Sequence, residues 1–245
     1  MFSNMSSAKY EDLEMGKGAL YPGHSSEDIM LRWGFLRKVY GILSMQMILT
    51  TIVASVVVFT ESVKDFFIRS PFLLIFLAFV PLILMIPLYY YHKSHPTNLA
   101  LLGLFTVAVS LTVGISCAFT PGIIVLEALL LTATVVLALT AYTYYAVKQG
   151  KDFEFLGPAL FVSVIVLVVF GFIQMFFPLG NIGSAIYGGV GSLIFSLYIV
   201  YDTDNLIKRY DVDEYIWASV SLYLDIINLF LSLLQVLRSI QGGNN

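Results

Sequence analysis

Runs of about 20 apolar residues alternate with short polar breaks from residue 39 to residue 240. A helix of about 20 residues is about 30 Å long, which matches the hydrocarbon core of a bilayer. The breaks hold Gly, Pro, Asn or charged residues, as expected between helices. Because every break is short, consecutive helices should pack as antiparallel neighbours in one bundle. We predict seven transmembrane helices, over residues 39–60, 71–91, 98–119, 122–147, 156–179, 184–207 and 215–240.

The composition agrees with this pattern and predicts an all-α integral membrane protein. Hydrophobic residues make up 58% of the chain and charged residues only 12%, which is outside the range of soluble domains. The formal net charge of -3 gives no reason to expect a nucleic-acid partner. The single cysteine, Cys117, lies in an apolar run and is expected to be a packing residue.

The chain divides into three parts by composition. Residues 1–34 carry mixed charge without a long apolar core, so we expect a mostly disordered cytosolic arm and no cleavable signal. Residues 35–240 form the membrane domain, and residues 241–245 form a short tail.

The distribution of Lys and Arg predicts the orientation. Ten of these residues fall in the N-terminal arm and in the second, fourth and sixth loops, whereas the opposite side holds three: Lys64, Arg69 and Arg238. Basic loops remain on the cytosolic side, so the N-terminus should be cytosolic and the C-terminus lumenal or outside.

A carboxylate interrupts the seventh predicted helix in the stretch "SLYLDIINLF". At helical spacing the polar residues of this helix fall within about 80° of arc. We expect this stripe to face other helices or water, while the remaining apolar surface faces lipid. The stripe consists of Ser221, Asp225, Asn228, Ser232, Gln235 and Ser239.

A second acid, Asp202, lies in the sixth helix in "SLYIVYDTDNLIKRY". Tyr198 and Asn205 share its face, together with two glycines that would allow a neighbouring helix to approach closely. Asp204 points nearly opposite and lies close to Lys208, so we interpret it as an interfacial or helix-end residue. A third acid, Glu127, lies early in the fourth helix and is therefore nearer a membrane surface than the other two.

An Asp at the centre of a span costs about 2.5–3.5 kcal/mol on insertion scales, so it rarely persists without a partner or a role. One interpretation is a structural acid that hydrogen bonds to the next helix. The other is a functional pair, because Asp202 and Asp225 lie on consecutive helices. In a low-dielectric site both cannot readily be ionised, so such a pair would titrate in coupled steps and sense protons. With Asn228 it would also offer oxygen ligands to calcium, though too few for tight binding.

Several segments together resemble the BAX inhibitor family, in its Lifeguard branch, and suggest a plant member. They are "LRWGFLRKVYGILSMQMILT", "HPTN", "VLEALLLTATVV", "SLYIVYDTDNLI" and "SLYLDIINLFLSLLQVLR". The resemblance implies a seven-helix bundle with the seventh helix central, in the endoplasmic reticulum, the Golgi or the vacuole. It further implies suppression of stress-induced cell death and a pH-sensitive calcium leak.

By motif, Asp202 and Asp225 correspond to the family's proton-sensing aspartates on the calcium path. The supporting polar residues would be Tyr198, Asn205, Ser221, Asn228, Ser232 and Glu127. In some relatives a basic residue after the second helix latches the sixth-helix aspartate. Here the segment "YYYHKSHP" offers His92 and Lys93, for which a solvated loop is the alternative.

Two other functions are left open by the residues. The protein could act on cell death through membrane protein partners, with the aspartates serving only bundle assembly. An intramembrane aspartyl protease of the presenilin type is disfavoured, because "GPAL" at 157–160 precedes both aspartates and glycines are missing around Asp225. We therefore expect no enzyme and no resident cofactor, only transient calcium and the lipid bilayer.

Overall fold

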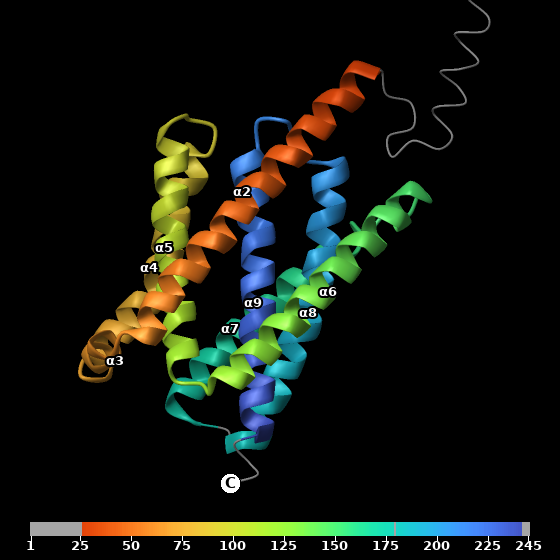
Figure 1. The fold of residues 1–245 in the computed structure, drawn as a ribbon. Coiled ribbons are helices and arrows are strands. Elements are labelled where there is room, and N and C mark those ends of the chain that lie inside the picture. Colours follow the sequence, from red (N-terminus) through yellow and green to blue (C-terminus); the bar gives the residue numbers. More distant parts are fainter. Residues whose placement is uncertain (1–25, 179, 242–245) are drawn as a thin grey trace, which may run out of the picture.

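The computed structural model describes residues 26–178 and 180–241, and the elements in these ranges are all helices (Figure 1). Seven of them are long and apolar enough to cross a membrane, which confirms the predicted all-α bundle. The eighth, α3, is a short helix between the first two spans. The helices are α2 (Ser26–Phe59), α3 (Glu61–Ile68), α4 (Pro71–Tyr91), α5 (Thr97–Ala118), α6 (Gly122–Lys148), α7 (Leu156–Phe176), α8 (Gly180–Lys208) and α9 (Tyr215–Gln241).

Two segments differ from the prediction. Residues 26–34, predicted to belong to a disordered arm, continue α2 as helix, because Phe35 and Leu36 are buried and hold this end of the helix on the bundle. Residues 61–68, predicted as a loop, form α3, which buries Phe67. Residues 1–25 and 242–245, the rest of the predicted arm and most of the predicted tail, lie outside the described residues.

The bundle has two distinct ends. The connections α4–α5, α6–α7 and α8–α9 meet at one end, which we call the basic end because it carries Lys93, Lys148, Lys151, Lys208 and Arg209. The opposite end carries α3 and the connections α5–α6 and α7–α8 (Figure 1).

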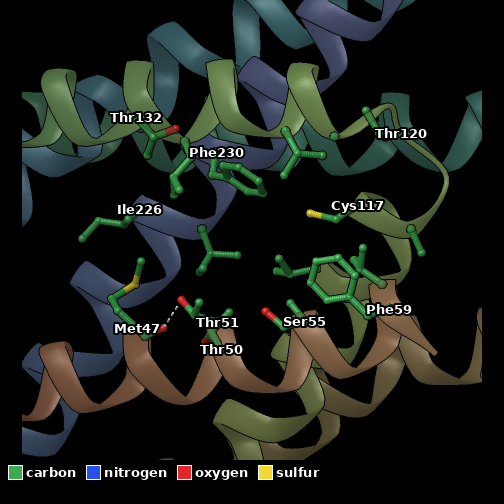
Figure 2. A pocket seen from close by; sticks show the side chains of 18 of the residues that line it. Met47, Thr50, Thr51, Ser55, Phe59, Cys117, Thr120, Thr132, Ile226 and Phe230 are labelled. Atoms are coloured by element: carbon green, nitrogen blue, oxygen red, sulfur yellow. Dashed lines mark hydrogen bonds between the residues drawn. The ribbon is translucent and has the colours of Figure 1, made fainter.

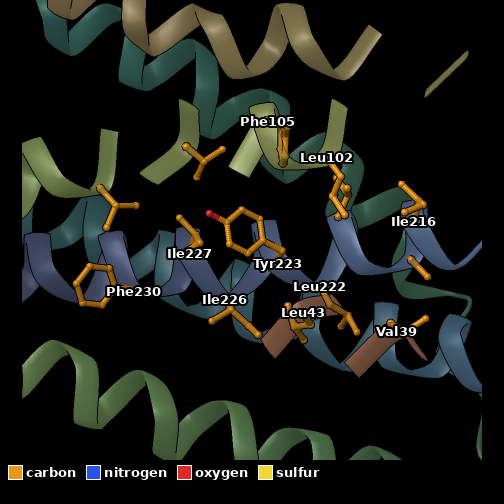
Figure 3. Packing of buried hydrophobic residues seen from close by; sticks show 14 of the residues in the cluster. Val39, Leu43, Leu102, Phe105, Ile216, Leu222, Tyr223, Ile226, Ile227 and Phe230 are labelled. Atoms are coloured by element: carbon orange, nitrogen blue, oxygen red, sulfur yellow. The ribbon is translucent and has the colours of Figure 1, made fainter. Parts of the chain in front are cut away.

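Helix α9 is the centre of the bundle, as the resemblance implied. It packs against α8, α6, α2 and α5, and Figure 3 shows its side chains meeting Val39 and Leu43 of α2 and Leu102 and Phe105 of α5. The expectation that its apolar surface faces lipid is therefore wrong. Periodicity separates the polar face of a helix from its apolar face, but both faces of α9 meet protein. The buried side chains include Leu222, Tyr223, Ile226, Ile227, Leu229 and Phe230.

Buried hydrogen bonds join α2, α5 and α9. The Gln46 amide donates to the Thr106 hydroxyl at 3.1 Å, and the Ser110 hydroxyl donates to the Thr50 hydroxyl at 3.0 Å. The Thr50 and Tyr223 hydroxyls are 2.7 Å apart. Between membrane helices, where lipid offers no polar partner, such bonds and close packing hold the helices together.

The closest approach of α8 and α9 occurs at two glycines. A Cβ atom added at Gly188 would lie 2.8 Å from the Ser232 carbonyl oxygen and 2.9 Å from a Val236 methyl group. A Cβ atom added at Gly191 would lie 2.8 Å from the Ser232 hydroxyl. The absence of side chains at these positions is what allows the two helices to touch.

We expect Gly188→Ala to lower the free energy of unfolding by about 1–3 kcal/mol, the usual cost of overpacking, because the obstacle is backbone that cannot turn aside. The neighbouring Gly189→Ala is the control, since a Cβ atom there meets no atom within 4 Å. Thermal unfolding in detergent would measure both variants. Equal thermal unfolding midpoints for the Gly188 and Gly189 variants would contradict the close contact at Gly188.

Candidate functional site: a buried aspartate pair

Asp202 of α8 and Asp225 of α9 lie toward the basic end of the bundle. Their exposed fractions are 9% and 5%, so both carboxyl groups are almost removed from solvent. The glycine contact brings α8 and α9 together along the face that carries both acids. The sequence therefore predicted both members of the pair and the helices that carry them.

The side chains of Asp202 and Asp225 are neighbours in this buried site. In the part of the chain that the structure describes, the buried Asp225 Oδ2 atom has no hydrogen-bond partner. Two carboxylate oxygens cannot form a hydrogen bond unless one of them carries a proton. Like charges held close in a poorly solvated site therefore favour a pair that shares one proton.

A chain of side-chain hydrogen bonds leads from Asp202 toward the basic end. The Asn205 amide donates to Asp202 Oδ1 at 3.4 Å, and its own carbonyl oxygen accepts from Arg209 Nη1 at 2.7 Å. Asn205 was predicted as a supporting residue from its helical phase, and the structure gives it a partner on each side.

Tyrosines surround the pair. Tyr198 of α8 lies near both carboxyl groups, as predicted from the face it shares with Asp202. Tyr210, in the α8–α9 connection, also lies near both, and its hydroxyl is 3.3 Å from the hydroxyl of Ser221. Burial and the nearby Asp202 raise the pKa of Tyr210, so this phenol remains protonated. The sequence prediction missed Tyr210, because helical phase says nothing about a residue beyond the helix end.

Asp204 is the centre of a separate ion cluster. Its side chain is fully buried, 2.6 Å from Lys208 Nζ and 2.7 Å from Arg209 Nη1, and its Oδ2 atom also accepts from the backbone N–H of Phe153 at 3.3 Å. The expected neighbourhood of Lys208 is confirmed. Asp204 lies in the last turn of α8, as the helix-end interpretation predicted, but the α6–α7 connection covers this face of α8 and buries its carboxylate.

The course of the α6–α7 connection results from one glycine. Gly150 has a φ of +78°, and the N–H of the next residue, Lys151, bonds back to the Ala146 carbonyl at 3.0 Å, which ends α6. The chain then turns so that Asp152 Oδ1 and Glu154 Oε2 lie 2.5 and 3.2 Å from Arg209 Nη2. The ion cluster, which we define as Asp152, Glu154, Asp204, Lys208 and Arg209, thus joins two connections at the basic end.

Asp152 of the ion cluster remains ionised at the pH of a cell. A hydrogen bond from the backbone N–H of Glu154, together with Arg209, lowers the pKa of Asp152 from 3.8 to about 2. Because the folded state holds the carboxylate more readily, the resulting stability is present above pH 3.8 and is lost as the pH falls toward about 2. The contribution is small, since Asp152 is half exposed.

The other predicted residues lie apart from the pair. Lys93 forms an ion pair with Glu214 at 3.3 Å, and a ring nitrogen of His92 contacts the Tyr89 carbonyl oxygen, so the structure pairs neither of the two candidate latch residues with Asp202.

Glu127 accepts from Gln241 at 3.1 Å near the opposite end. Asn228 donates to its own helix, at the Leu224 carbonyl, and Ser232 lies in the glycine contact.

A polar cavity of about 490 Å³ opens at the opposite end between α5, α8 and α9. Gln235 and Ser239 line it, so the polar stripe of α9 runs from this cavity toward Asp225. The contact of Gly188 and Gly191 with Ser232 lies on that stripe between the cavity and the aspartates. The remaining polar lining residues are Ser116, Thr120, Asn181, Ser184 and Arg238.

The pair offers few ligands for a metal ion. Within residues 26–178 and 180–241, no three His, Cys, Asp or Glu side chains are grouped so as to hold one. Two carboxyl groups with one amide fall short of the six to eight oxygens that calcium takes in a tight site. The geometry therefore suits proton exchange and brief cation contact better than storage.

Comparisons with known proteins agree with the arrangement. A family model described as "Inhibitor of apoptosis-promoting Bax1" matches residues 32–242. The BI1-like protein of Arabidopsis thaliana is 61% identical over 241 residues, covering 98% of this chain and 93% of that protein. Protein LIFEGUARD 2 of the same plant is 57% identical, covering 94% and 98%. The Golgi anti-apoptotic protein of Vaccinia virus (strain Lister) is 38% identical, covering 87% and 89%.

We expect Asp204→Asn to lower the free energy of unfolding by about 2–3 kcal/mol, somewhat less than the cost of breaking a fully buried pair, because Lys208 and Arg209 retain partial contact with water. Asp152→Asn should cost less than about 1 kcal/mol, as for exposed pairs. Asp213→Asn, an exposed acid in the α8–α9 connection, is the matched control. Denaturation in detergent would measure the free energy of unfolding of the three variants. An Asp204 variant as stable as the Asp213 variant would contradict the buried position of Asp204 in the ion cluster.

Proposed function

Because the chain belongs to the BAX inhibitor family, in its Lifeguard branch, we propose that it is a pH-sensitive calcium leak of an intracellular membrane that suppresses stress-induced cell death. The observation that carries the proposal is the contact between the buried carboxyl groups of Asp202 and Asp225. The printed name of the viral relative, Golgi anti-apoptotic protein, supports both the cell-death role and the Golgi, with the endoplasmic reticulum and the vacuole as further candidate membranes.

The shared proton makes the pair a switch. When the proton leaves, two negative charges face each other in a site that little water reaches, and their repulsion acts to separate α8 from α9. The same separation would loosen the contact of Gly188 and Gly191 with Ser232, which lies between the aspartates and the polar cavity. Proton exchange at the aspartate pair and the width of the path at the glycine contact are thereby linked through α8 and α9.

The polar stripe of α9 supports a cation path. From the cavity at the opposite end, Gln235, Ser232 and Asn228 offer oxygen atoms in steps of one helical turn up to Asp225. Arg238 at the cavity opposes cations, which favours a slow leak over rapid conduction. Calcium is the cargo in this scheme, no resident cofactor is required, and no bond is made or broken, so the role is not enzymatic.

The orientation of the path follows from the basic loops. If the basic end faces the cytosol, as the distribution of Lys and Arg predicts, the polar cavity opens to the lumenal store and the aspartates lie on the cytosolic side. The proton that the pair exchanges then comes from the cytosol, through the α8–α9 connection that carries Tyr210.

We expect purified wild-type protein in liposomes to release calcium at a rate that changes with pH. Asp225→Asn and Asp202→Asn should give rates that do not vary with pH, because an amide resembles a protonated acid at every pH. Asp213→Asn should behave as the wild type, since this exposed acid lies away from the pair. Entrapped calcium indicator measures the flux at several pH values. Identical pH profiles for the wild type and both pair variants would refute the leak as proposed.

The same variants, expressed in stressed cells, connect the leak to cell death. Loss of protection with Asp202→Asn plus Asp225→Asn, at normal protein levels, would support the leak as the protective activity. Retained protection in a folded double variant would instead favour an interaction protein that acts through membrane partners.

A further inference from the structure

A second cavity, largely apolar and of about 500 Å³, lies between α2 and α6 (Figure 2). It exists because α6 packs on α8 and α9 and makes little contact with α2 or α5. Ile226 and Phe230 of α9 form its inner wall, and Cys117 points into it from α5. Its size falls in the range of ligand pockets, about 300–1,000 Å³.

The threonine hydroxyl groups along this cavity already form hydrogen bonds, whereas within the described residues no such bond is found for Ser55. Thr51, Thr120 and Thr132 each donate to the carbonyl four residues earlier in the chain, at 2.9, 2.8 and 2.7 Å. They therefore present mainly methyl groups to the cavity, and the remaining lining is mostly Val, Ile, Leu, Phe, Met and Ala. Such a lining gives ordered water few partners and suits an apolar occupant.

The cavity reaches the lipid-facing surface of the bundle. Phe59 and Leu129, from α2 and α6, line it and have exposed fractions of 83% and 51%. Both residues belong to helices that are long and apolar enough to cross a membrane, so the surroundings of this opening are acyl chains.

One charge lies at the edge of the cavity. Lys64 of α3 is the single charged side chain among its described lining residues, and α3 follows Phe59, where the first span ends. Its acidic neighbours on α3, Glu61 and Asp65, are not part of the lining. An apolar cavity inside the membrane, with an ammonium group at its surface end, matches an amphiphile that has an apolar chain and an anionic head.

We propose that the cavity between α2 and α6 binds an acyl chain of an anionic phospholipid, whose phosphate lies against Lys64. This site is separate from the aspartate pair and does not depend on calcium flux. The acyl chain fills the space that α6 leaves beside α2. The charge of the headgroup determines which lipid is selected.

The single cysteine of the chain provides the test, because Cys117 reports on the cavity without an engineered probe. The full-length protein would be placed in nanodiscs of phosphatidylcholine alone, or of phosphatidylcholine with phosphatidylglycerol. The measurement is the rate at which N-ethylmaleimide alkylates Cys117. We expect phosphatidylglycerol to slow alkylation about fivefold in the wild type, as one lysine–lipid charge contact predicts.

Variants at the surface end identify the headgroup contact. Lys64→Ala should remove the difference between the two lipids, whereas Arg69→Ala, a basic residue at the same end that does not line the cavity, should keep it. Equal rates in the two lipids for the wild type, or a full difference in Lys64→Ala, would overturn the proposal.

A filling substitution tests the chain-binding part. We expect native mass spectrometry to show that the wild type retains phosphatidylglycerol. Ser55→Trp should block the cavity, slow alkylation in both lipids and abolish this retention. Thermal unfolding establishes that the variant is folded. Retention of phosphatidylcholine and phosphatidylglycerol alike by the wild type would also overturn the assignment of an anionic lipid.

Discussion

The contact of α8 with α9 at Gly188 and Gly191 is the constraint from which the rest of the site follows. A Cβ atom at Gly188 would meet the backbone of Ser232, so these two helices can approach only without side chains at that position. The approach makes Asp202 and Asp225 neighbours. Because α2, α5 and α6 enclose the other faces of α9, water cannot relieve the charge on Asp225. Close packing thereby makes two separate acids into one electrostatically coupled unit.

The basic end combines two charge arrangements with different properties. The ion cluster around Asp204 has two cations for its buried carboxylate, and its exposed member Asp152 stays ionised down to a pH of about 2. The aspartate pair, in contrast, forms no ion pair within the described residues, and its two carboxyl groups are neighbours of each other. Asn205 lies between them and hydrogen bonds to both Asp202 and Arg209. A change of protonation in the pair therefore reaches the α6–α7 and α8–α9 connections through a single amide.

Much of this architecture can be predicted from the sequence, because a membrane span must be apolar over a fixed length and an acid inside it must face protein. Those two requirements give the seven spans and the pair Asp202–Asp225. They do not give the buried position of Asp204, since its carboxylate is covered by a connection that turns at Gly150, a feature of backbone conformation that apolar periodicity does not encode. The two requirements also do not predict what the apolar face of α9 contacts, because a residue such as Ile227 is equally suited to lipid and to a neighbouring helix.

The central position of α9 has a further consequence for the path along it. Asp225 faces α8, while the next residue, Ile226, lines the apolar cavity on the other side of the same helix. A helix turn is stiff, so a displacement of α9 away from α8 must narrow the space toward α2 and α6, and an occupied cavity resists that displacement. The apolar cavity and the aspartate pair would thus be coupled through the width of one helix. The coupling requires no long chain of contacts, because the two sites use adjacent residues of one helical turn.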